Sequence, residues 1–152
     1  MEVYRLANAR RADDLTGTGA RLVGGRWNYV GTPALYTASS RALATLEILV
    51  HSPISYTPDT YQMLTIRVPD DSLLSVPPDQ LPDGWNGLTP PTSIKDITER
   101  WIADSRFLLL KVPSAAVEGD YNFLINPMHP RASDVMITDK KPYRFDPRLL
   151  RE

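Results

Sequence analysis

The chain has 152 residues, 42% of them hydrophobic, and its 17 Lys and Arg against 18 Asp and Glu give a formal net charge of −1. This length fits one domain with a sizeable core, and the near-neutral charge gives no electrostatic reason to expect nucleic-acid binding. Cysteine is absent and only two histidines occur, which excludes disulfides, thiol catalysis and metal sites built from thiolates or several histidines. No apolar run approaches the ~18 residues that span a bilayer, and no signal-peptide pattern opens the chain. We therefore expect a cytoplasmic protein without membrane segments.

The predicted elements are short, because fourteen prolines interrupt the chain. Hydrophobic patterning and turn residues divide it into successive segments. In chain order they are a strand at Val3–Leu6, a mostly irregular stretch at Asp13–Gly25, a strand at Ala34–Thr37, a helix from Ser39 or Ser40 to about His51, a strand at Tyr61–Val68, a proline-rich connection at Leu73–Pro91, a helix at Ser93–Ser105, and strands at Phe107–Val112, Asn122–Asn126 and Val135–Thr138. Strands outnumber helices, which favours an α+β fold over a doubly wound sheet.

Both predicted helices begin at a serine, whose hydroxyl can accept an otherwise unpaired backbone N–H. Pro53 is expected to end the first helix. The second helix, with Ser93 as its cap, carries its apolar residues on one face. These residues are Ile94, Ile97, Trp101 and Ile102. The apolar segment Phe107–Val112 is expected to form a central strand.

Glu47 interrupts the apolar run ALATLEILV at residues 42–50. Its neighbours three and four positions away on a helix are mostly apolar or small, namely Leu43, Ala44, Val50 and His51. A buried, unpaired carboxylate is very costly, so this side chain must reach solvent or meet a partner. Two interpretations stay open. Glu47 is either an exposed glutamate in contact with His51, the commoner case, or a carboxylate at the floor of a cleft.

The stretch GGRWN at residues 24–28, followed by Gly31, is a second candidate for a site. Glycines let the backbone approach a ligand closely or adopt positive φ. The planar guanidinium of Arg26 suits phosphate oxygens, and Trp27 and Asn28 would add an aromatic wall and an amide. A tight turn with an exposed arginine explains the same residues equally well.

Two further residues have both a structural and a functional interpretation. Tyr36 lies in a short strand just before the first helix, a type and position that favour a core residue. Ser114, in the sequence VPSA at 112–115, directly follows a predicted strand. A hydroxyl at a strand end serves a binding site or caps a turn.

Several short motifs, taken in order, resemble the RES domain, a family named for its Arg, Glu and Ser. They are Tyr4-Arg5, Gly17 with Gly19, GGRWN at 24–28, Gly31, Leu35-Tyr36, Leu46-Glu47, VPSA at 112–115, NFLINPMHP at 122–130 and FDPR at 145–148. Each motif is short, but their order and completeness from Tyr4 to about Leu149 make the resemblance specific.

The resemblance implies a single RES domain over residues 1–152, with a compact mixed-sheet fold similar to that of ADP-ribosyltransferase toxins. RES proteins are toxins of type II toxin–antitoxin pairs with Xre-type antitoxins. Known members consume NAD, by hydrolysis or phosphorolysis or by transfer of ADP-ribose to a protein. The resemblance therefore implies NAD as a substrate rather than a cofactor, inorganic phosphate as an optional co-substrate, and an Xre-type antitoxin as the partner.

The family's polar site falls on Arg5, Arg26, Tyr36, Glu47 and Ser114 of this chain. The resemblance implies that the two arginines clamp the pyrophosphate and that Tyr36 stacks on the nicotinamide ring. Ser114 would hydrogen-bond the nicotinamide amide or the adjoining ribose. Glu47 would stabilise the positive charge that develops as the nicotinamide–ribose bond breaks. Two nearby guanidinium groups would also lower the pKa of Glu47.

Asn126 and His129 lie in the family's C-terminal motif and are assigned no firm role, although His129 fits a structural position that holds a loop. No GxGxxG sequence follows a predicted strand, so the expected mode of NAD binding is not that of a Rossmann fold.

Three other functions remain as alternatives at this stage. The first is ADP-ribosyl transfer onto a cellular protein, and the second is a non-enzymatic binding or structural module, since each candidate residue also has an ordinary structural role. The third, DNA binding, is disfavoured by the charge and by the lack of a recognisable helix-turn-helix. Whether the segment Leu73–Pro91 is a lid or a partner contact stays open.

Overall fold

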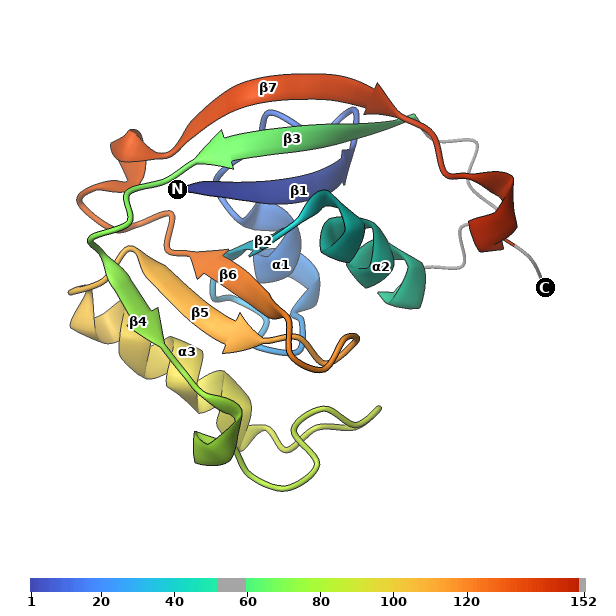
Figure 1. Cartoon of the computed structure of the whole chain (residues 1–152). Coiled ribbons are helices and arrows are strands. Elements are labelled where there is room, and N and C mark those ends of the chain that lie inside the picture. Colours follow the sequence, from blue (N-terminus) through green and yellow to red (C-terminus); the bar gives the residue numbers. More distant parts are fainter. Residues whose placement is uncertain (52–59, 151–152) are drawn as a thin grey trace.

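The computed structural model describes residues 1–51 and 60–150, and Figure 1 shows their arrangement. Within these residues the strands form one seven-stranded sheet in the order β4-β5-β6-β2-β1-β3-β7. The strands are β1 Glu2–Asn8, β2 Leu35–Ala38, β3 Tyr61–Arg67, β4 Leu73–Ser75, β5 Leu109–Pro113, β6 Tyr121–Ile125 and β7 Met136–Tyr143. The helices are α1 Thr18–Val23, α2 Arg41–His51 and α3 Ser93–Asp104, with 3-10 turns at Pro78–Gln80, Ala132–Asp134 and Pro147–Leu150.

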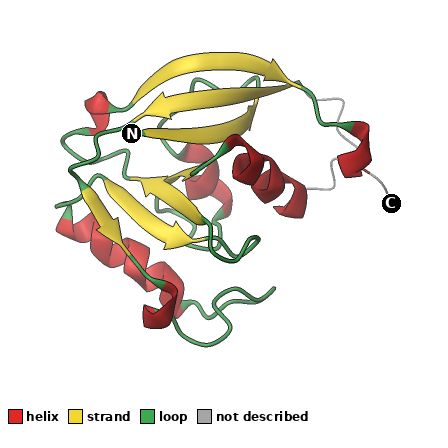
Figure 2. Cartoon of the chain, viewed as in Figure 1, coloured by secondary structure: helices red, strands yellow, loops and turns green. Residues whose placement is uncertain are grey.

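The sheet is mixed, because β4 and β5 run parallel while the other neighbouring strands run antiparallel. Such a sheet with separate helices confirms the predicted α+β fold with a mixed sheet. Figure 2 shows the strands and helices by colour. Among the described residues, no helix is long and apolar enough to cross a membrane.

The sheet is divided between β1 and β2. β1 pairs with β3 from Glu2 to Asn8, but it pairs with β2 at a single position, Tyr4 opposite Ala38. Beyond this position the two strands separate. The sheet therefore consists of a half with β1, β3 and β7 and a half with β2, β6, β5 and β4, which are distinct in Figure 1.

Each half of the sheet has its own helix. α3 buries Ile94 and Trp101 against the half that contains β5 and β6, where Leu110 and Leu124 are fully buried. α2 packs Leu43 and Ala44 against Leu6 of β1 and Met63 of β3. Full burial of a leucine or isoleucine stabilises a fold by roughly 1.5–3 kcal/mol. These contacts therefore fix α2 beside the gap between β1 and β2.

Most predicted elements are present, with different limits. Ser40 caps α2 as expected, since its Oγ accepts a 3.0 Å hydrogen bond from the backbone N–H of Leu43. Trp101 and Ile94 are buried, and Ile97 and Ile102 pack against the same cluster, which confirms the apolar face of α3. Pro53, the expected end of α2, lies outside the described residues.

The structure corrects three expectations. The segment Asp13–Gly25 contains α1, whose residues are not buried and so carry no apolar periodicity. The connection Leu73–Pro91 contains β4, which is too short to show alternation. Ser93 is the first residue of α3, and Thr92 occupies the cap position without a side-chain hydrogen bond. The predicted central strand at Phe107–Val112 is confirmed, since β5 pairs with β4 and β6 and buries Leu109, Leu110 and Val112 fully.

Candidate functional site

A pocket of about 620 Å³ lies where β1 and β2 separate. This volume falls within the range of small-molecule binding sites. Its walls come from β1, the segment around residues 20–27, β2, α2, and the start of β6. Four of the five predicted site residues line it: Arg5, Arg26, Tyr36 and Glu47. The tertiary fold thus brings together side chains from β1, the segment after α1, β2 and α2.

Glu47 is held by two hydrogen bonds at one carboxylate oxygen. Its Oε1 accepts from Ser114 Oγ at 2.8 Å and from Asn122 Nδ2 at 2.8 Å. Its Oε2 lies 3.7 Å from Nε2 of His51, one helical turn further on. The side chain is 23% exposed, against 60% for His51. Glu47 is therefore a half-buried carboxylate in a pocket, which also retains the expected contact with His51.

The pKa of Glu47 is set by opposing effects. Burial raises the pKa, because it disfavours the charged form, but the nearby His51 and the hydrogen bonds from Asn122 and Ser114 outweigh it and bring the pKa below the ordinary value of 4.5. The expected cause was different, since the two arginines were predicted to lower this pKa. The carboxylate is ionised at neutral pH, with one oxygen occupied by protein donors.

Arg26 is fixed through one end of its guanidinium. Its Nη1 donates to the backbone carbonyls of Trp85, at 2.9 Å, and Gly87, at 2.8 Å. Among the described residues, its Nε and Nη2 have no hydrogen-bond acceptor. Those two nitrogens form the edge of a guanidinium that gives two parallel hydrogen bonds to one phosphate or carboxylate. Arg26 is thus anchored in the pocket wall, and it is not the exposed arginine of a tight turn.

Arg5 has a similar arrangement on β1. Its Nη1 lies 3.4 Å from the carbonyl of Arg11, 3.5 Å from that of Ala12 and 3.2 Å from that of Asp14. Burial lowers the pKa of Arg5, the Asp14 carboxylate raises it, and Arg11 lowers it further. A desolvated cation without an ion pair among the described residues favours an anion as its ligand.

Tyr36 has its hydroxyl bound within the protein. The hydroxyl donates to Asn28 Oδ1 at 2.6 Å and accepts from the backbone N–H of Trp27 at 3.1 Å. Burial raises the pKa of Tyr36 well above its ordinary value. A Cβ at Gly25 would lie 2.7 Å from the same hydroxyl, so glycine is required there. Only the ring of Tyr36 is left to contact a ligand.

Asn28 is a structural residue, which corrects its expected role as a ligand amide. It is fully buried, and its Nδ2 donates to the carbonyls of Ala20, Tyr29 and Thr32. Trp27 is 3% exposed and belongs to the core cluster under α3, although part of it reaches the pocket. The GGRWN segment therefore contributes one polar side chain to the pocket, that of Arg26.

Ser114 contacts Glu47 rather than the pocket space. Its hydroxyl has one proton, which it donates to Glu47, and its oxygen accepts from the backbone N–H groups of Ala116 and Val117 at 3.1 Å each. Its neighbour Ala115 lines the pocket, whereas Ser114 is 3% exposed and does not. This corrects the expected hydrogen bond from Ser114 to a ligand: the serine holds the carboxylate.

Asn122 is a residue of the site that was not predicted from the sequence. An ionised carboxylate only accepts hydrogen bonds, so the amide nitrogen of Asn122 must face Glu47, as it does. Its Oδ1 is buried without a partner among the described residues. Asn122 opens the quoted motif NFLINPMHP, but nothing in the sequence marked it apart from Asn126. Its register opposite Ala38 of β2 places it at the pocket.

Asn126 and His129 stabilise the turn after β6, away from the pocket. Asn126 Oδ1 accepts from the backbone N–H of Met128 at 2.9 Å. His129 Nδ1 accepts from the backbone N–H of Arg131 at 3.0 Å. These contacts confirm the structural interpretation of His129 as a residue that holds a loop.

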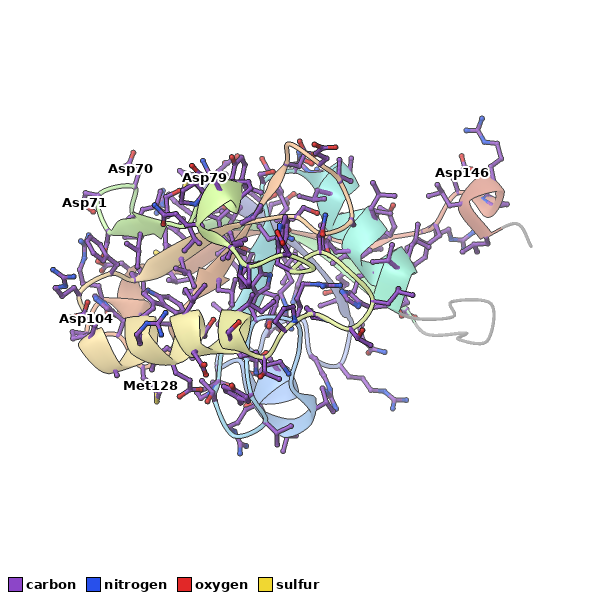
Figure 3. The ribbon with its side chains drawn as sticks, turned by 90° about the horizontal axis from the view of Figure 1, so that it is seen from below. Asp70, Asp71, Asp79, Asp104, Met128 and Asp146 are labelled. Carbon is purple, nitrogen blue, oxygen red and sulfur yellow. The ribbon has the colours of Figure 1, made fainter. Side chains whose placement is uncertain are left out.

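The charges of the molecule favour an anion at this pocket. Arg5, Arg11 and Arg26 line it beside a single carboxylate, Glu47. Of the acidic residues labelled in Figure 3, Asp70, Asp71 and Asp104 lie away from α2, whereas Asp146 lies on the same side as α2. A pocket lined mainly by charges of one sign attracts ligands of the opposite sign. Within residues 1–51 and 60–150, no group of three or more His, Asp or Glu side chains is placed to hold a metal ion.

The mixed seven-stranded sheet with its separate helices is the fold of a solved protein. The structure matches the crystal structure of the M. tuberculosis MbcT–MbcA toxin–antitoxin complex with a TM-score of 0.78, over 93% of this chain and 83% of that chain, at 22% sequence identity. The RES domain family model matches residues 2–146. The chain belongs to the RES domain family.

Curated relatives span nearly the same length. The chain is 40% identical to the "Prs ADP-ribosylating toxin" of a Sphingobium species, over 98% of this chain and 96% of the relative. It is 36% identical to "Toxin Res" of Yersinia enterocolitica, over 98% of this chain and 99% of the relative. These matches confirm the family that the ordered motifs indicated.

Proposed function

We propose that this toxin consumes NAD by breaking the bond between nicotinamide and ribose. The observation that carries the proposal is the arrangement in one pocket of a held, ionised Glu47 and two arginines, Arg5 and Arg26, with unused donors. A dinucleotide offers the matching groups, since it has a pyrophosphate with two negative charges and ribose hydroxyls that donate hydrogen bonds. NAD is a substrate in this proposal, and no cofactor takes part.

The arginines bind the pyrophosphate. Each is anchored at Nη1 by backbone carbonyls, which leaves Nε and Nη2 for phosphate oxygens. Anchored side chains lose little entropy on binding, which favours affinity. The ring of Tyr36, fixed by its hydroxyl, stacks on the nicotinamide and sets the angle of the bond that breaks.

Glu47 acts on the ribose. One of its oxygens is occupied by Ser114 and Asn122, so its Oε2 accepts the hydrogen bond from a ribose hydroxyl. The bond from C1′ to the ring nitrogen breaks and its electron pair leaves with neutral nicotinamide. The positive charge then develops on C1′ and the ring oxygen, as in glycoside cleavage. A fixed carboxylate beside this charge stabilises the transition state.

Water or inorganic phosphate then attacks C1′. Attack by water gives ADP-ribose and releases a proton to solvent, whereas attack by phosphate gives ADP-ribose that carries a phosphate on this same carbon. Transfer of ADP-ribose onto a protein side chain is the second candidate function. The relative named "Prs ADP-ribosylating toxin", 40% identical to this chain, favours it. Both functions begin with the same bond cleavage and differ in the acceptor.

Purified protein incubated with NAD tests the shared step. Free nicotinamide is followed by chromatography, with and without inorganic phosphate, and labelled NAD with cell extract reports transfer to protein. Release of nicotinamide without labelled protein supports the degradative function, and a labelled protein band supports transfer. No release under any of these conditions would contradict both and favour a non-enzymatic binding module.

The partner in this proposal is an Xre-type antitoxin that neutralises the toxin in the cytoplasm. The support is the resemblance to RES proteins and the solved relative, which is a toxin–antitoxin complex. Induction of the chain alone should stop growth, and co-expression of an Xre-type antitoxin that binds it should restore growth. Growth arrest that the Glu47→Gln variant causes equally would contradict NAD consumption as the cause.

A further inference from the structure

The loop between the 3-10 turn Pro78–Gln80 and α3 contacts two consecutive residues of the GGRWN segment. Its backbone carbonyls at Trp85 and Gly87 accept both hydrogen bonds of Arg26 Nη1. Its Trp85 ring packs on the ring of Trp27, with 6.3 Å between centroids and 40° between planes. Residues about sixty positions apart in the sequence are thus joined at the pocket wall.

The loop is shaped to present these two carbonyls. The backbone N–H of Trp85 donates to the carbonyl of Pro82 at 3.2 Å, and that of Gly87 donates to the carbonyl of Gly84 at 3.0 Å. Gly84 has φ +81°, a conformation that other residues adopt with strain. Two overlapping turns therefore point the carbonyls of Trp85 and Gly87 at the same guanidinium nitrogen.

We infer that this loop, residues 82–87, is a positioning element that orients Arg26 so that its Nε–Nη2 edge receives a phosphate of the substrate. The inference rests on the proposed function for the identity of the ligand. Part of the segment Leu73–Pro91 then belongs to the binding site, and it acts there through its backbone carbonyls rather than through a charged side chain. The Trp85 ring takes part indirectly, because its packing on Trp27 holds the loop in place.

The physical effect is preorganisation. A free arginine must lose its side-chain freedom when it binds, at a cost of about 0.5–1.5 kcal/mol, or roughly 2- to 10-fold in affinity. Loss of the guanidinium itself removes charge-assisted hydrogen bonds and costs about 10- to 100-fold. Disturbing the loop should therefore weaken pyrophosphate binding less than removing Arg26 does, and it should do so only while Arg26 is present.

The test measures binding of ADP-ribose by calorimetry, since this ligand has the pyrophosphate but cannot lose nicotinamide. Arg26→Ala should weaken binding about 10- to 100-fold. Trp85→Ala and Gly84→Ala should each weaken it about 2- to 10-fold, and neither should weaken it further in the Arg26→Ala background. Leu88→Ala, at a fully exposed residue of the same connection, is the matched control and should bind like the wild type. Circular dichroism confirms that each variant is folded.

The results separate this inference from the proposed function. Wild-type affinity in Trp85→Ala and Gly84→Ala, or an equal loss with and without Arg26, would overturn the positioning role while leaving nicotinamide release from NAD untouched. Failure of the wild type to bind ADP-ribose would overturn it as well. Normal binding with the expected pattern of losses, but no release of nicotinamide from NAD, would overturn the proposed reaction and support the positioning role.

Discussion

Replacing Glu47 with Gln removes a charge from the pocket with little change of shape. The amide oxygen can take the position of Oε1, where Ser114 Oγ and Asn122 Nδ2 each donate at 2.8 Å. The amide nitrogen then takes the position of Oε2, which lies 3.7 Å from His51 Nε2. Both protein donors keep an acceptor, so we expect the Glu47→Gln variant to fold with a thermal midpoint close to that of the wild type.

The expected loss is in the rate of bond cleavage. Removing one well-placed electrostatic group slows an enzyme by ~10²–10³, or about 2.7–4 kcal/mol of transition-state stabilisation. Glu47 is 23% exposed, so water screens its charge only in part. We therefore expect the loss in kcat for Glu47→Gln to reach this range rather than the small effect of a surface charge.

The assay follows nicotinamide release at saturating NAD, which separates kcat from KM. Glu118→Gln, at an exposed residue outside the pocket, is the matched control and should react like the wild type. If Glu47→Gln released nicotinamide as fast as the wild type, the electrostatic role of this carboxylate would be refuted. The hydrogen bonds of Glu47 would then stabilise the fold without a role in catalysis.

Three further outcomes are expected. The pKa of Glu47 lies below 4.5, so the stability that the ionised carboxylate contributes is complete above that pH and is lost as the pH falls through the folded-state pKa. Ser114→Ala removes one hydrogen-bond donor to Glu47 and should therefore raise this pKa. The acid limit of the pH–rate profile should then move to higher pH. Tyr36→Phe should lower the free energy of unfolding in urea by about 1–3 kcal/mol, because two buried groups lose their partner. Gly25→Ala should reduce activity by displacing the Tyr36 hydroxyl, from which its Cβ would lie 2.7 Å; the control Gly19→Ala, whose nearest neighbour would lie at 3.5 Å, should have little effect.

The sequence was sufficient for the elements whose residues bury a regular face. α3 has a helical pattern with one buried face, and β3 is an apolar run with four consecutive buried residues; both form close to the predicted limits. α1 and β4 were not predicted, and the reason differs between them. α1 buries none of its residues, and β4 has three residues, which is too few for a periodic signal.

The candidate residues were also predictable by type, but several of their roles were not. The ordered motifs placed Arg5, Arg26, Tyr36 and Glu47 in one site, and all four line the pocket. Ser114 was expected to contact a ligand, yet its single hydroxyl proton goes to Glu47. The hydrogen-bond partner of Ser114 depends on where the fold places Glu47, and a local sequence pattern does not encode that position.

The sequence by itself determined the α+β class, the helix that carries Glu47, and the residue types that suit an anionic, sugar-bearing ligand. Only the tertiary structure decided that β1 and β2 separate after Tyr4, which opens the pocket. It also decided that Asn122 holds the carboxylate and that the carbonyls of Trp85 and Gly87 anchor Arg26. The physical reason is that patterns of burial are local and periodic, whereas a hydrogen bond between residues some sixty or more positions apart depends on strand register and loop shape.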